Sequence, residues 1–329
     1  MKVAINGFGR IGRSVFKIAL EKGIDIVAIN DVHGPEDAHY LLKYDSVYGR
    51  YDKKISHTKN HLIVGNKKIL VLQERDPEKL PWKKLGVDVV IESTGVFRDR
   101  EGASKHLKAG ANKVVITSPA KNPDTTIVPG VNHKEITKTK KIISVASCTT
   151  NCLTPILKVI DDKFGIKQAL MTTTHAYTNN QAVHDQYSEK KRRGRSAANN
   201  IIPTTTGAAE AVIEVLPQLK GKLKAKAIRV PIPVGSIIDL TITTNKPSNA
   251  EKINETIKKA STTNMKGIIE YSEDEIVSSD IIKNPHSSVF DSLLTESIGN
   301  TTKLFSWYDN EYGYSNRVVD VIQIIKKQK

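Results

Sequence analysis

The chain has 329 residues, 39% of them hydrophobic, which exceeds what one hydrophobic core usually serves and predicts two domains. It shows no apolar run of the roughly 20 residues that a membrane helix needs and no apolar leader, so we expect neither membrane insertion nor export. It has only two cysteines, so we expect no disulfide framework and a protein of the reducing cytoplasm. Its 50 lysine and arginine residues against 35 acidic residues give a net charge of +15, which predicts attraction to anions such as nucleic acid, acidic surfaces or phosphorylated metabolites.

The first half of the chain alternates short β-branched runs with helical patterns. Strands are predicted at residues 2–6, 26–30, 87–92, 114–118 and 142–146, and helices at residues 11–22 and 100–109. Because strand and helix alternate, we expect an α/β domain with a parallel, doubly wound sheet over residues 1–147.

A different pattern begins near residue 148. A helix is predicted at residues 149–163, and long strands at residues 168–174, 225–230 and 237–243. We expect an α+β domain over residues 148–312, with a mostly antiparallel sheet and helices on one face. An apolar stripe at residues 314–327 predicts a terminal helix within a last segment, residues 313–329.

The segment Gly7-Phe8-Gly9-Arg10-Ile11-Gly12 fits the pattern G-x-G-x-x-G between a predicted strand and a predicted helix. Gly7 permits a tight turn, Gly9 lets the backbone approach a pyrophosphate, and Gly12 lets helix and strand pack closely, as in a Rossmann domain. The N–H groups at the start of the helix would face the phosphates. Asp31, at the end of the second strand, can accept hydrogen bonds from a ribose and would repel a 2′-phosphate, which favours NAD over NADP.

Cys148 lies between a predicted strand and a predicted helix. The dipole and the unpaired N–H groups of a helix N-terminus favour thiolate over thiol, so we expect a nucleophile near neutral pH. Cys152 lies one turn further along the helix and is expected to be a packed, unreactive thiol. The two cysteines lack the further ligands that zinc requires, so no metal site is predicted.

His175 is the candidate base. It directly follows a predicted strand, where side chains reach the edge of the sheet, and hydroxyl and amide side chains come after it. These features are equally typical of an exposed histidine in a polar loop, so the residues alone leave both interpretations open.

Several segments make the chain similar to the glyceraldehyde-3-phosphate dehydrogenase family from end to end. They are NGFGRIGR at residues 6–13, SCTTNCL at 147–153, PTTTGAA at 203–209, LKGKL at 219–223, RVP at 229–231 and WYDNEYGYS at 307–315. The resemblance implies that Cys148 adds to the aldehyde of glyceraldehyde 3-phosphate, that a hydride passes from the hemithioacetal to NAD, and that inorganic phosphate cleaves the resulting thioester. It implies His175 as the general base and 1,3-bisphosphoglycerate as the product.

The resemblance also implies the residues that hold the ligands. Around the substrate's own phosphate it places Thr178, Arg193 and Arg229, and around the attacking phosphate Ser147, Thr149, Thr206 and Gly207. Around the cofactor it adds Phe8, Arg10, Ile11, Arg75, Thr94, Gly95, Ser118 and Asn316 to the glycines and Asp31. Because Asn316 belongs to the last segment, residues 313–329 are expected to pack on the NAD-binding domain. The family's usual assembly implies a homotetramer.

Six positions depart from the family's usual pattern, among them Pro129 for a Met and Tyr312 for a Trp, neither of which touches the chemistry. Asn180 and Ala182 stand where Asp and Arg are common, which predicts a different polar arrangement around the substrate phosphate. Gln186 and Tyr187 replace a Leu-Pro pair that often accompanies strict use of NAD, so Asp31 is the main residue that favours NAD.

Three other functions stay open at this level. One is a scaffold or interaction role with an inactive site, which the intact Cys148, His175 and Asn316 argue against. Erythrose-4-phosphate dehydrogenase is a close relative that hydrolyses its thioester instead of cleaving it with phosphate. A basic nucleic-acid-binding protein with a Rossmann domain would also use the charge of +15. The sequence has no basic stripe interleaved with aromatic residues, so we expect any nucleic-acid binding to be secondary and steeply salt-dependent.

Overall fold

The computed structural model describes residues 1–328, which form two compact units. The first unit consists of residues 1–127 and 133–146 together with the chain from Ser315 onward, and the second of residues 128–132 and 147–314. The boundaries predicted after residues 147 and 312 differ from these units at Ser147, at residues 313–314 and at the short segment 128–132. Ser147 belongs to the second unit because its side chain caps the helix that follows it.

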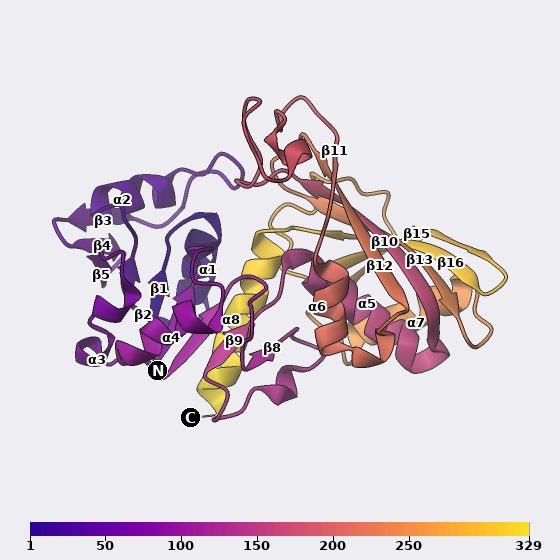
Figure 1. The fold of residues 1–329 in the computed structure, drawn as a ribbon, viewed down its shortest axis with the longest axis horizontal. Coiled ribbons are helices and arrows are strands. Elements are labelled where there is room, and N and C mark those ends of the chain that lie inside the picture. Colours follow the sequence, from indigo (N-terminus) through magenta and orange to yellow (C-terminus); the bar gives the residue numbers. More distant parts are fainter. Residues whose placement is uncertain (329) are drawn as a thin grey trace. The chain divides into compact units, whose positions relative to one another are not determined.

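The first unit contains, within the described residues, a nine-stranded sheet in the order β3-β4-β5-β2-β1-β6-β7-β9-β8 (Figure 1). Its strands are β1 (Lys2–Asn6), β2 (Asp25–Asn30), β3 (Ile55–Thr58), β4 (His61–Val64), β5 (Lys67–Leu72), β6 (Val89–Glu92), β7 (Lys113–Ile116), β8 (Thr125–Thr126) and β9 (Ile142–Ser144). Neighbours from β5 through β8 in this order are parallel, and β3 and β4 add an antiparallel edge. The predicted parallel, doubly wound sheet is confirmed; the hairpin of β3 and β4 was not predicted.

Helices cover this sheet at the two predicted places, residues 11–22 and 100–109, and at further places that were not predicted. They are α1 (Arg10–Glu21), α2 (Pro35–Lys43), α3 (Trp82–Leu85) and α4 (Arg100–Lys108), with the short helices η1 (Pro77–Lys79) and η2 (His133–Glu135). Helix α1 packs on β1 and β2, and α4 packs on β7 and β9. All four residues of β6 are buried, as expected for a parallel strand that is covered on both faces. From Ser315 onward, α8 (Tyr312–Lys327) also belongs to this unit.

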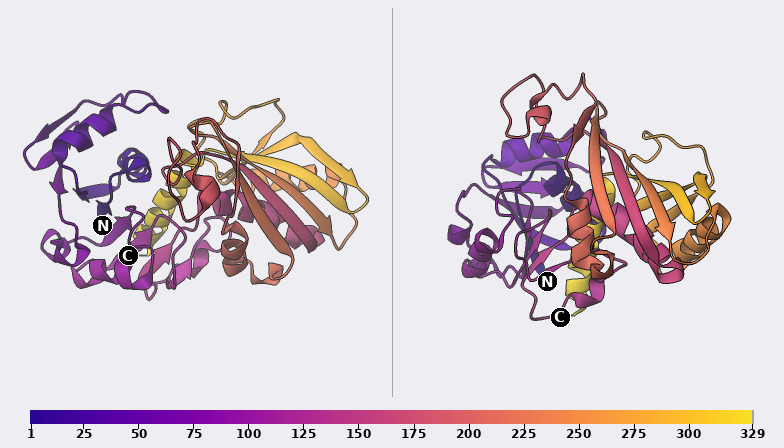
Figure 2. Two further views of the ribbon diagram at one scale, coloured as in Figure 1. Left: turned by 45° about the horizontal axis from the view of Figure 1, so that its top comes forward. Right: turned by 45° about the vertical axis from the view of Figure 1, so that its right-hand side comes forward.

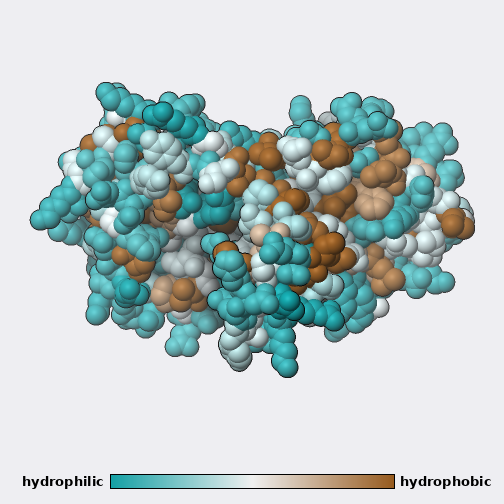
Figure 3. Space-filling view, turned by 90° about the horizontal axis from the view of Figure 1, so that it is seen from above, coloured by the Kyte–Doolittle hydropathy of each residue, from teal (hydrophilic) through white to brown (hydrophobic). Residues whose placement is uncertain are grey.

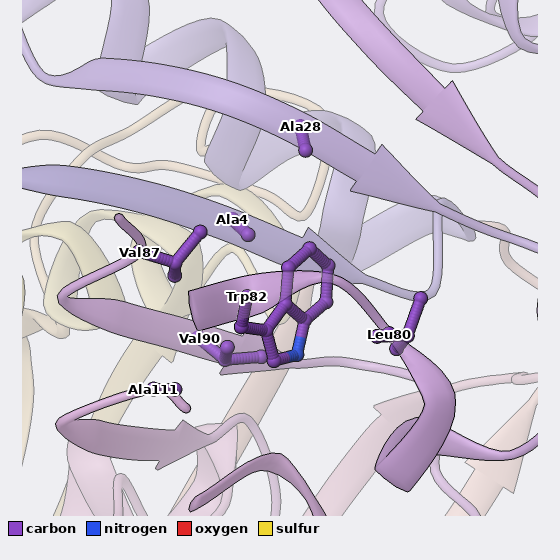
Figure 4. Close-up of a cluster of buried hydrophobic side chains, with 7 residues drawn as sticks. All are labelled: Ala4, Ala28, Leu80, Trp82, Val87, Val90 and Ala111. Carbon is purple, nitrogen blue, oxygen red and sulfur yellow. The ribbon is translucent and has the colours of Figure 1, made fainter. Parts of the chain in front are cut away.

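Trp82 is the largest fully buried side chain of the first unit (Figure 4). Its indole lies among small and branched side chains, namely Ala4, Ala28, Leu80, Val87, Val90 and Ala111. The alanines of β1 and β2 leave the space that the indole fills. Its Nε1–H donates to Nδ1 of the buried His106 at 3.0 Å, so the polar end of the ring is also satisfied.

The second unit contains a seven-stranded sheet, again within the described residues, in the order β11-β12-β10-β13-β16-β15-β14. Its strands are β10 (Ile166–Ala176), β11 (Ile202–Thr204), β12 (Leu223–Val230), β13 (Ser236–Thr244), β14 (Ile269–Ser272), β15 (Ser288–Ile298) and β16 (Thr301–Tyr308). The pairs β10–β12 and β14–β15 are parallel and the others are antiparallel, so the sheet is mixed. The prediction of a mostly antiparallel sheet holds except at these two pairs.

Helices gather on one face of this sheet, as Figures 1 and 2 show. They are α5 (Cys148–Phe164), α6 (Ala208–Val215) and α7 (Ala250–Thr262), and η4 (Pro217–Leu219) packs on α6. The short helix η3 (Lys191–Gly194) lies in the loop beside β11. Helix α5 contacts α6, α7 and four strands, β10, β13, β15 and β16. Burial alternates residue by residue along β13, because only one face of the sheet is covered by helices.

Hydrophilic residues cover most of the surface that Figure 3 shows, with apolar residues interspersed. Several large apolar side chains of the second unit are nevertheless exposed, among them Leu170, Val183, Tyr187 and Ile298. Among the described helices, none combines the length and the apolar character that crossing a membrane requires.

We expect Trp82→Phe to lower the free energy of unfolding by about 1–3 kcal/mol, because Nδ1 of His106 would stay buried without its donor. Urea unfolding followed by circular dichroism measures the change. Tyr187→Phe, at a side chain that is 91% exposed, is the control and should leave the unfolding curve unchanged. A Trp82→Phe protein as stable as the wild type would show that the Trp82–His106 bond contributes nothing to stability.

Candidate active site and cofactor pocket

A pocket of about 380 Å³ lies at the carboxyl ends of β1, β2 and β6 in the first unit. The chain places β2 on one side of β1 and β6 on the other, and ligands bind α/β sheets at such reversals of strand order. The pocket is lined by Asn6, Gly7, Gly9, Asn30, Asp31, Val32, Glu74, Arg75, Ser93, Thr94, Val96 and Phe97. Five of the predicted cofactor residues are therefore in the lining: Gly7, Gly9, Asp31, Arg75 and Thr94.

The three glycines of the motif differ in what surrounds them. Gly7 has φ +92°, and a Cβ there would lie 2.5 Å from the backbone nitrogen of Thr94. A Cβ on Gly12 would lie 2.1 Å from the carbonyl oxygen of Gly7. A Cβ on Gly9 would meet nothing within 4 Å, so the fold itself does not require glycine there. Gly9 precedes α1 and makes no side-chain cap, which leaves the first N–H groups of the helix for an anion.

Asp31 is held in a fixed orientation. The backbone N–H of Phe8 donates to Oδ2 at 2.6 Å, and the backbone N–H of His33 donates to Oδ1 at 3.2 Å. Burial acts to raise the pKa of Asp31, but these hydrogen bonds outweigh it and hold the pKa below its ordinary value. The carboxylate is therefore charged at neutral pH beside the pocket.

The other predicted cofactor residues do not line this pocket. Phe8 is buried, with its ring edge-on to Phe16 at 5.4 Å, and Arg10 lies 3.4 Å from a carboxylate oxygen of Asp45. Ile11 and Gly12 belong to α1, Gly95 is exposed after β6, the carbonyl of Ser118 accepts from Ser144, and Asn316 is buried in α8.

A buried polar network lies beneath the pocket. Oε2 of Glu92 accepts from Nδ2 of Asn6 at 2.6 Å and lies 3.0 Å from Nε2 of His106. Its Oε1 accepts from the backbone N–H of Thr94 at 2.8 Å. Because Nδ1 of His106 accepts from Trp82, the ring proton is on Nε2 and faces Glu92. The network thereby fixes Thr94, and sequence patterns gave no indication of Glu92 or His106.

In the second unit, helix α5 begins at Cys148, one residue before the predicted start. Oγ of Ser147 accepts from the backbone N–H of Thr150 at 3.0 Å, which makes Ser147 the N-cap and Cys148 the first helical residue. The predicted strand extends to Ala176, so His175 lies inside β10 and not beyond its end. Nε2 of His175 is 3.4 Å from Sγ of Cys148, which brings the predicted nucleophile and base into contact.

Burial dominates the protonation of this pair. It raises the pKa of the Cys148 thiol above its ordinary value, against the charge of Arg229 and hydrogen bonds from Thr149, which act to lower it. Burial, followed by the charge of Arg229, lowers the pKa of His175 to about 3. Burial therefore acts against the predicted lowering of the thiol pKa. That Cys148 is a nucleophile near neutral pH stays a prediction.

Two arginines lie near His175 without a carboxylate partner among residues 1–328. Nη1 of Arg229 lies 2.7 Å from Nδ1 of His175 and donates to the carbonyl oxygen of Ala176 at 2.9 Å. Arg193 donates to Oγ1 of Thr204 and to the carbonyl oxygen of Thr205, both at 2.9 Å. Burial lowers the pKa of both guanidinium groups, and they lie near enough for Arg193 to lower that of Arg229 further.

Two donors at this place are unused. Nε of Arg229 and Oγ1 of Thr178 are buried, and neither has a hydrogen-bond partner in the described part of the chain. Buried polar atoms without partners are rare in folded proteins. The unpaired charge and the unused Nε of Arg229 are features that a bound anion would satisfy.

The residues predicted to hold the attacking phosphate fall at two helix starts. Ser147 and Thr149 lie at the start of α5, and Oγ1 of Thr149 is 2.9 Å from the Tyr308 hydroxyl. Thr206 and Gly207 immediately precede α6, where Gly207 is exposed and Oγ1 of Thr206 accepts from the N–H of Ala208. Helices α5 and α6 pack against each other.

Comparison with known proteins decides the family. The model of the glyceraldehyde 3-phosphate dehydrogenase NAD binding domain matches residues 1–100, and that of the C-terminal domain matches residues 147–310. Glyceraldehyde-3-phosphate dehydrogenase of Borreliella burgdorferi is 55% identical, over 99% of this chain and 100% of that protein. Glyceraldehyde-3-phosphate dehydrogenase of Geobacillus stearothermophilus is 52% identical, over 99% of this chain and 98% of that protein. Glyceraldehyde-3-phosphate dehydrogenase 2 of Bacillus subtilis is 50% identical, over 98% of this chain and 96% of that protein. The chain belongs to the glyceraldehyde-3-phosphate dehydrogenase family.

The structure shows what surrounds the positions that depart from the usual pattern of glyceraldehyde-3-phosphate dehydrogenases. Ala182 is buried, and its backbone pairs with Arg193 and Ala197, so it helps to hold the loop that carries Arg193. Asn180 is exposed in the turn before it. The prediction that the polar arrangement around the substrate phosphate differs from the family's stays a prediction.

Tyr308 is a residue of the glyceraldehyde-3-phosphate dehydrogenase site that sequence reasoning did not single out. Its hydroxyl lies 2.9 Å from Oγ1 of Thr149 and 2.8 Å from Oγ1 of Thr173, and its ring meets the His175 ring edge-on at 5.9 Å. It therefore links α5, β10 and β16 directly behind the Cys148–His175 pair. Its position within the motif at residues 307–315 was the only available signal.

We expect Gly9→Ala and Gly12→Ala to separate folding from cofactor binding. Gly12→Ala should lower stability by about 1–3 kcal/mol, because its Cβ overlaps the Gly7 carbonyl. Gly9→Ala should change stability by less than about 0.5 kcal/mol and weaken NAD binding, because its Cβ would stand where the pyrophosphate approaches. Thermal unfolding and calorimetric NAD titration give the two quantities. Unchanged NAD affinity in Gly9→Ala would show that the pyrophosphate does not pass over Gly9.

Proposed function

We propose that the protein oxidises D-glyceraldehyde 3-phosphate to 1,3-bisphosphoglycerate, with reduction of NAD and uptake of inorganic phosphate. The contact between Sγ of Cys148 and Nε2 of His175 at the start of α5 carries this proposal. Membership of the glyceraldehyde-3-phosphate dehydrogenase family and the names of its relatives support the substrate.

The residues of the first unit suit NAD. Gly9 leaves the start of α1 open to a pyrophosphate, and the fixed carboxylate of Asp31 can accept from ribose hydroxyls. Arg75 and Thr94 line the same pocket, and we assign Phe8, Arg10, Ile11, Gly95, Ser118 and Asn316 to the cofactor as well. When bound, NAD supplies the acceptor for the hydride.

The chemistry of the chain's own residues centres on Cys148. Its sulfur adds to the aldehyde carbon as the thiol proton passes to His175 and from there to the aldehyde oxygen, which gives a hemithioacetal and returns His175 to its unprotonated form. His175 then takes the proton of the hemithioacetal hydroxyl as the hydride leaves, which gives a thioester. Inorganic phosphate attacks the thioester carbon, and the sulfur leaves and recovers its proton. The N–H groups at the start of α5 can stabilise the oxyanion that forms during the attack.

The two phosphate groups are assigned to separate residues. Arg229, Arg193 and Thr178 bind the substrate's own phosphate, since arginine forks and hydroxyls suit tetrahedral dianions and Arg229 and Thr178 have unused donors. We assign the attacking phosphate to the two helix starts, with Ser147, Thr149, Thr206 and Gly207 as its ligands.

Several properties of the whole protein belong to this proposal. We place it in the cytoplasm and assign it the family's homotetrameric assembly. The net charge of +15 suits anionic metabolites, and nucleic-acid binding, if present, is secondary to catalysis.

NADH formation from glyceraldehyde 3-phosphate, followed by absorbance with and without inorganic phosphate, tests the function. We expect strong, phosphate-dependent turnover. Cys148→Ser should abolish it, whereas Cys152→Ser, four residues along the same buried helix, should retain it. Turnover that does not depend on phosphate would indicate a hydrolytic erythrose-4-phosphate dehydrogenase, and no turnover would leave the binding functions.

Asp31→Asn tests the choice of cofactor. The amide oxygen can still accept the shorter of the two backbone bonds, from the N–H of Phe8, while the charge is removed. We expect the preference for NAD over NADP, as the ratio of kcat/KM values, to fall about tenfold, or about 1.4 kcal/mol, because the repulsion of a 2′-phosphate is lost. Glu36→Gln, which removes one negative charge from an exposed side chain of α2 outside the pocket lining, is the control. An unchanged ratio would mean that other residues select NAD.

A further inference from the structure

Glu92 is a buried carboxylate whose hydrogen-bond partners are all donors. Its Oε2 accepts from Nδ2 of Asn6 at 2.6 Å and lies 3.0 Å from Nε2 of His106. Its Oε1 accepts from the backbone N–H of Thr94 at 2.8 Å and also from the hydroxyl of that residue. Nδ1 of His106 accepts from the indole N–H of Trp82, so the proton of the ring is on Nε2 and points at Glu92. Four donors converge on two oxygens, and only a carboxylate accepts from all of them.

The burial of this group makes its arrangement stringent. Glu92 and Asn6 are each 1% exposed, and His106 is 0% exposed. Water does not reach these atoms to replace a lost acceptor, so a donor that loses Glu92 stays unpaired. Glu92 therefore determines how its neighbours are oriented.

Asn6 passes this orientation on to the next strand. Because Nδ2 of Asn6 faces Glu92, its Oδ1 is turned toward Asn30 and accepts from Nδ2 of that residue at 2.6 Å. The amide of Asn30 also bonds the backbone of Glu74: its Oδ1 accepts from the N–H at 2.9 Å, and its Nδ2 donates to the carbonyl oxygen at 2.8 Å. The hydrogen bonds thus run from the end of β6 through β1 and β2 to the residue before Arg75.

The outer members of this network line the cofactor pocket, whereas Glu92 does not. Asn6, Asn30, Glu74 and Thr94 all belong to the lining. They lie at or just beyond the carboxyl ends of β1, β2, β5 and β6, which are neighbours in the sheet. A pocket whose lining is already fixed binds its ligand without the entropy cost of ordering that lining.

We propose that Glu92 is a positioning residue for NAD, and that its carboxylate, from beneath the pocket, holds Asn6 and Thr94 in the orientation that receives the cofactor. Glu92 lies outside the pocket lining and acts through these neighbours. Its role is to preorganise the site, and it takes no part in hydride transfer. This inference rests on the proposed function only for the choice of NAD as the ligand.

Glu92→Gln tests the proposal, because it keeps the size of the side chain and replaces one acceptor oxygen by an NH₂ donor. Whichever way the amide turns, its NH₂ group faces the N–H of Thr94 or Nδ2 of Asn6, so part of the lining is released. We expect the Kd values of NAD and of ADP-ribose, measured by calorimetry, to rise about tenfold, while kcat at saturating NAD changes by less than about twofold. Unchanged Kd values would refute the proposal.

Trp82→Phe is the matched control. It removes the donor to His106 and lowers stability, but leaves the four donors to Glu92 in place, so both Kd values should equal those of the wild type. Equal losses of affinity in Trp82→Phe and Glu92→Gln would show that the network acts through stability alone. A rise in Kd for NAD without a rise for ADP-ribose would show that the carboxylate acts through its charge on the nicotinamide ring and not by positioning.

Hydrogen exchange of the wild type decides the matter if Glu92→Gln does not fold. The N–H of Thr94 is bonded to Glu92, and the N–H of Glu74 is bonded to Asn30. Mass spectrometry of peptides that cover these two amides should show slow exchange before NAD is added and little change afterwards. Fast exchange that slows only when NAD binds would show that the cofactor orders the pocket, and would overturn the inference.

These measurements separate the inference from the proposed function. Binding and exchange require no turnover, so weakened NAD binding in Glu92→Gln without NADH formation by the wild type would refute the function and keep the role of Glu92. Turnover of glyceraldehyde 3-phosphate with unchanged Kd values in Glu92→Gln would refute the role of Glu92 alone.

Discussion

The register of β10 between β12 and β13 is the constraint on which the rest of the site depends. The parallel pairing of β10 with β12 sets His175 beside Arg229, and the antiparallel pairing with β13 holds the other edge of β10. A shift by one residue would turn His175 to the opposite face of the sheet, away from α5. Helix α5 supplies Cys148 at its first turn on the helix-covered face, so the thiol and the imidazole meet only in this register.

Burial and the charge of Arg229 together determine how readily Cys148 loses a proton and His175 gains one. The half-buried thiol and the buried imidazole both favour their neutral forms, and the positive charge of Arg229 opposes this for the thiol but reinforces it for the imidazole. An anion bound beside Arg229 would favour the imidazolium but would remove support from the thiolate, so its two effects on proton transfer from sulfur to nitrogen oppose each other.

Local sequence patterns predicted the elements and the two reacting residues, because a strand, a glycine turn and a capped helix are encoded by neighbours in the chain. The start of α1 and the positions of Cys148 and Asp31 follow from such patterns. The contact of Arg229 with His175 could not follow from them, because it depends on strand register across 54 residues of sequence. Resemblance placed Arg229 at the substrate's phosphate but gave no indication of its effect on the imidazole.

The rise in the pKa of the Cys148 thiol could not be predicted for the same reason that Tyr308 and Glu92 were not singled out: both depend on the assembled fold. A helix terminus is visible in the sequence, but the depth at which it lies is set by β16, which places Tyr308 behind Cys148 and His175. Burial is a property of the assembled sheet and cannot be read from the helix alone. In the first unit, Glu92 likewise follows an unremarkable apolar strand, and only the fold brings it to Asn6 and His106. In both units, local sequence patterns indicate the residues that are predicted to react or to bind, whereas the residues that orient them come from strands distant in the sequence. The sequence therefore indicates which atoms react more readily than it indicates which atoms control them.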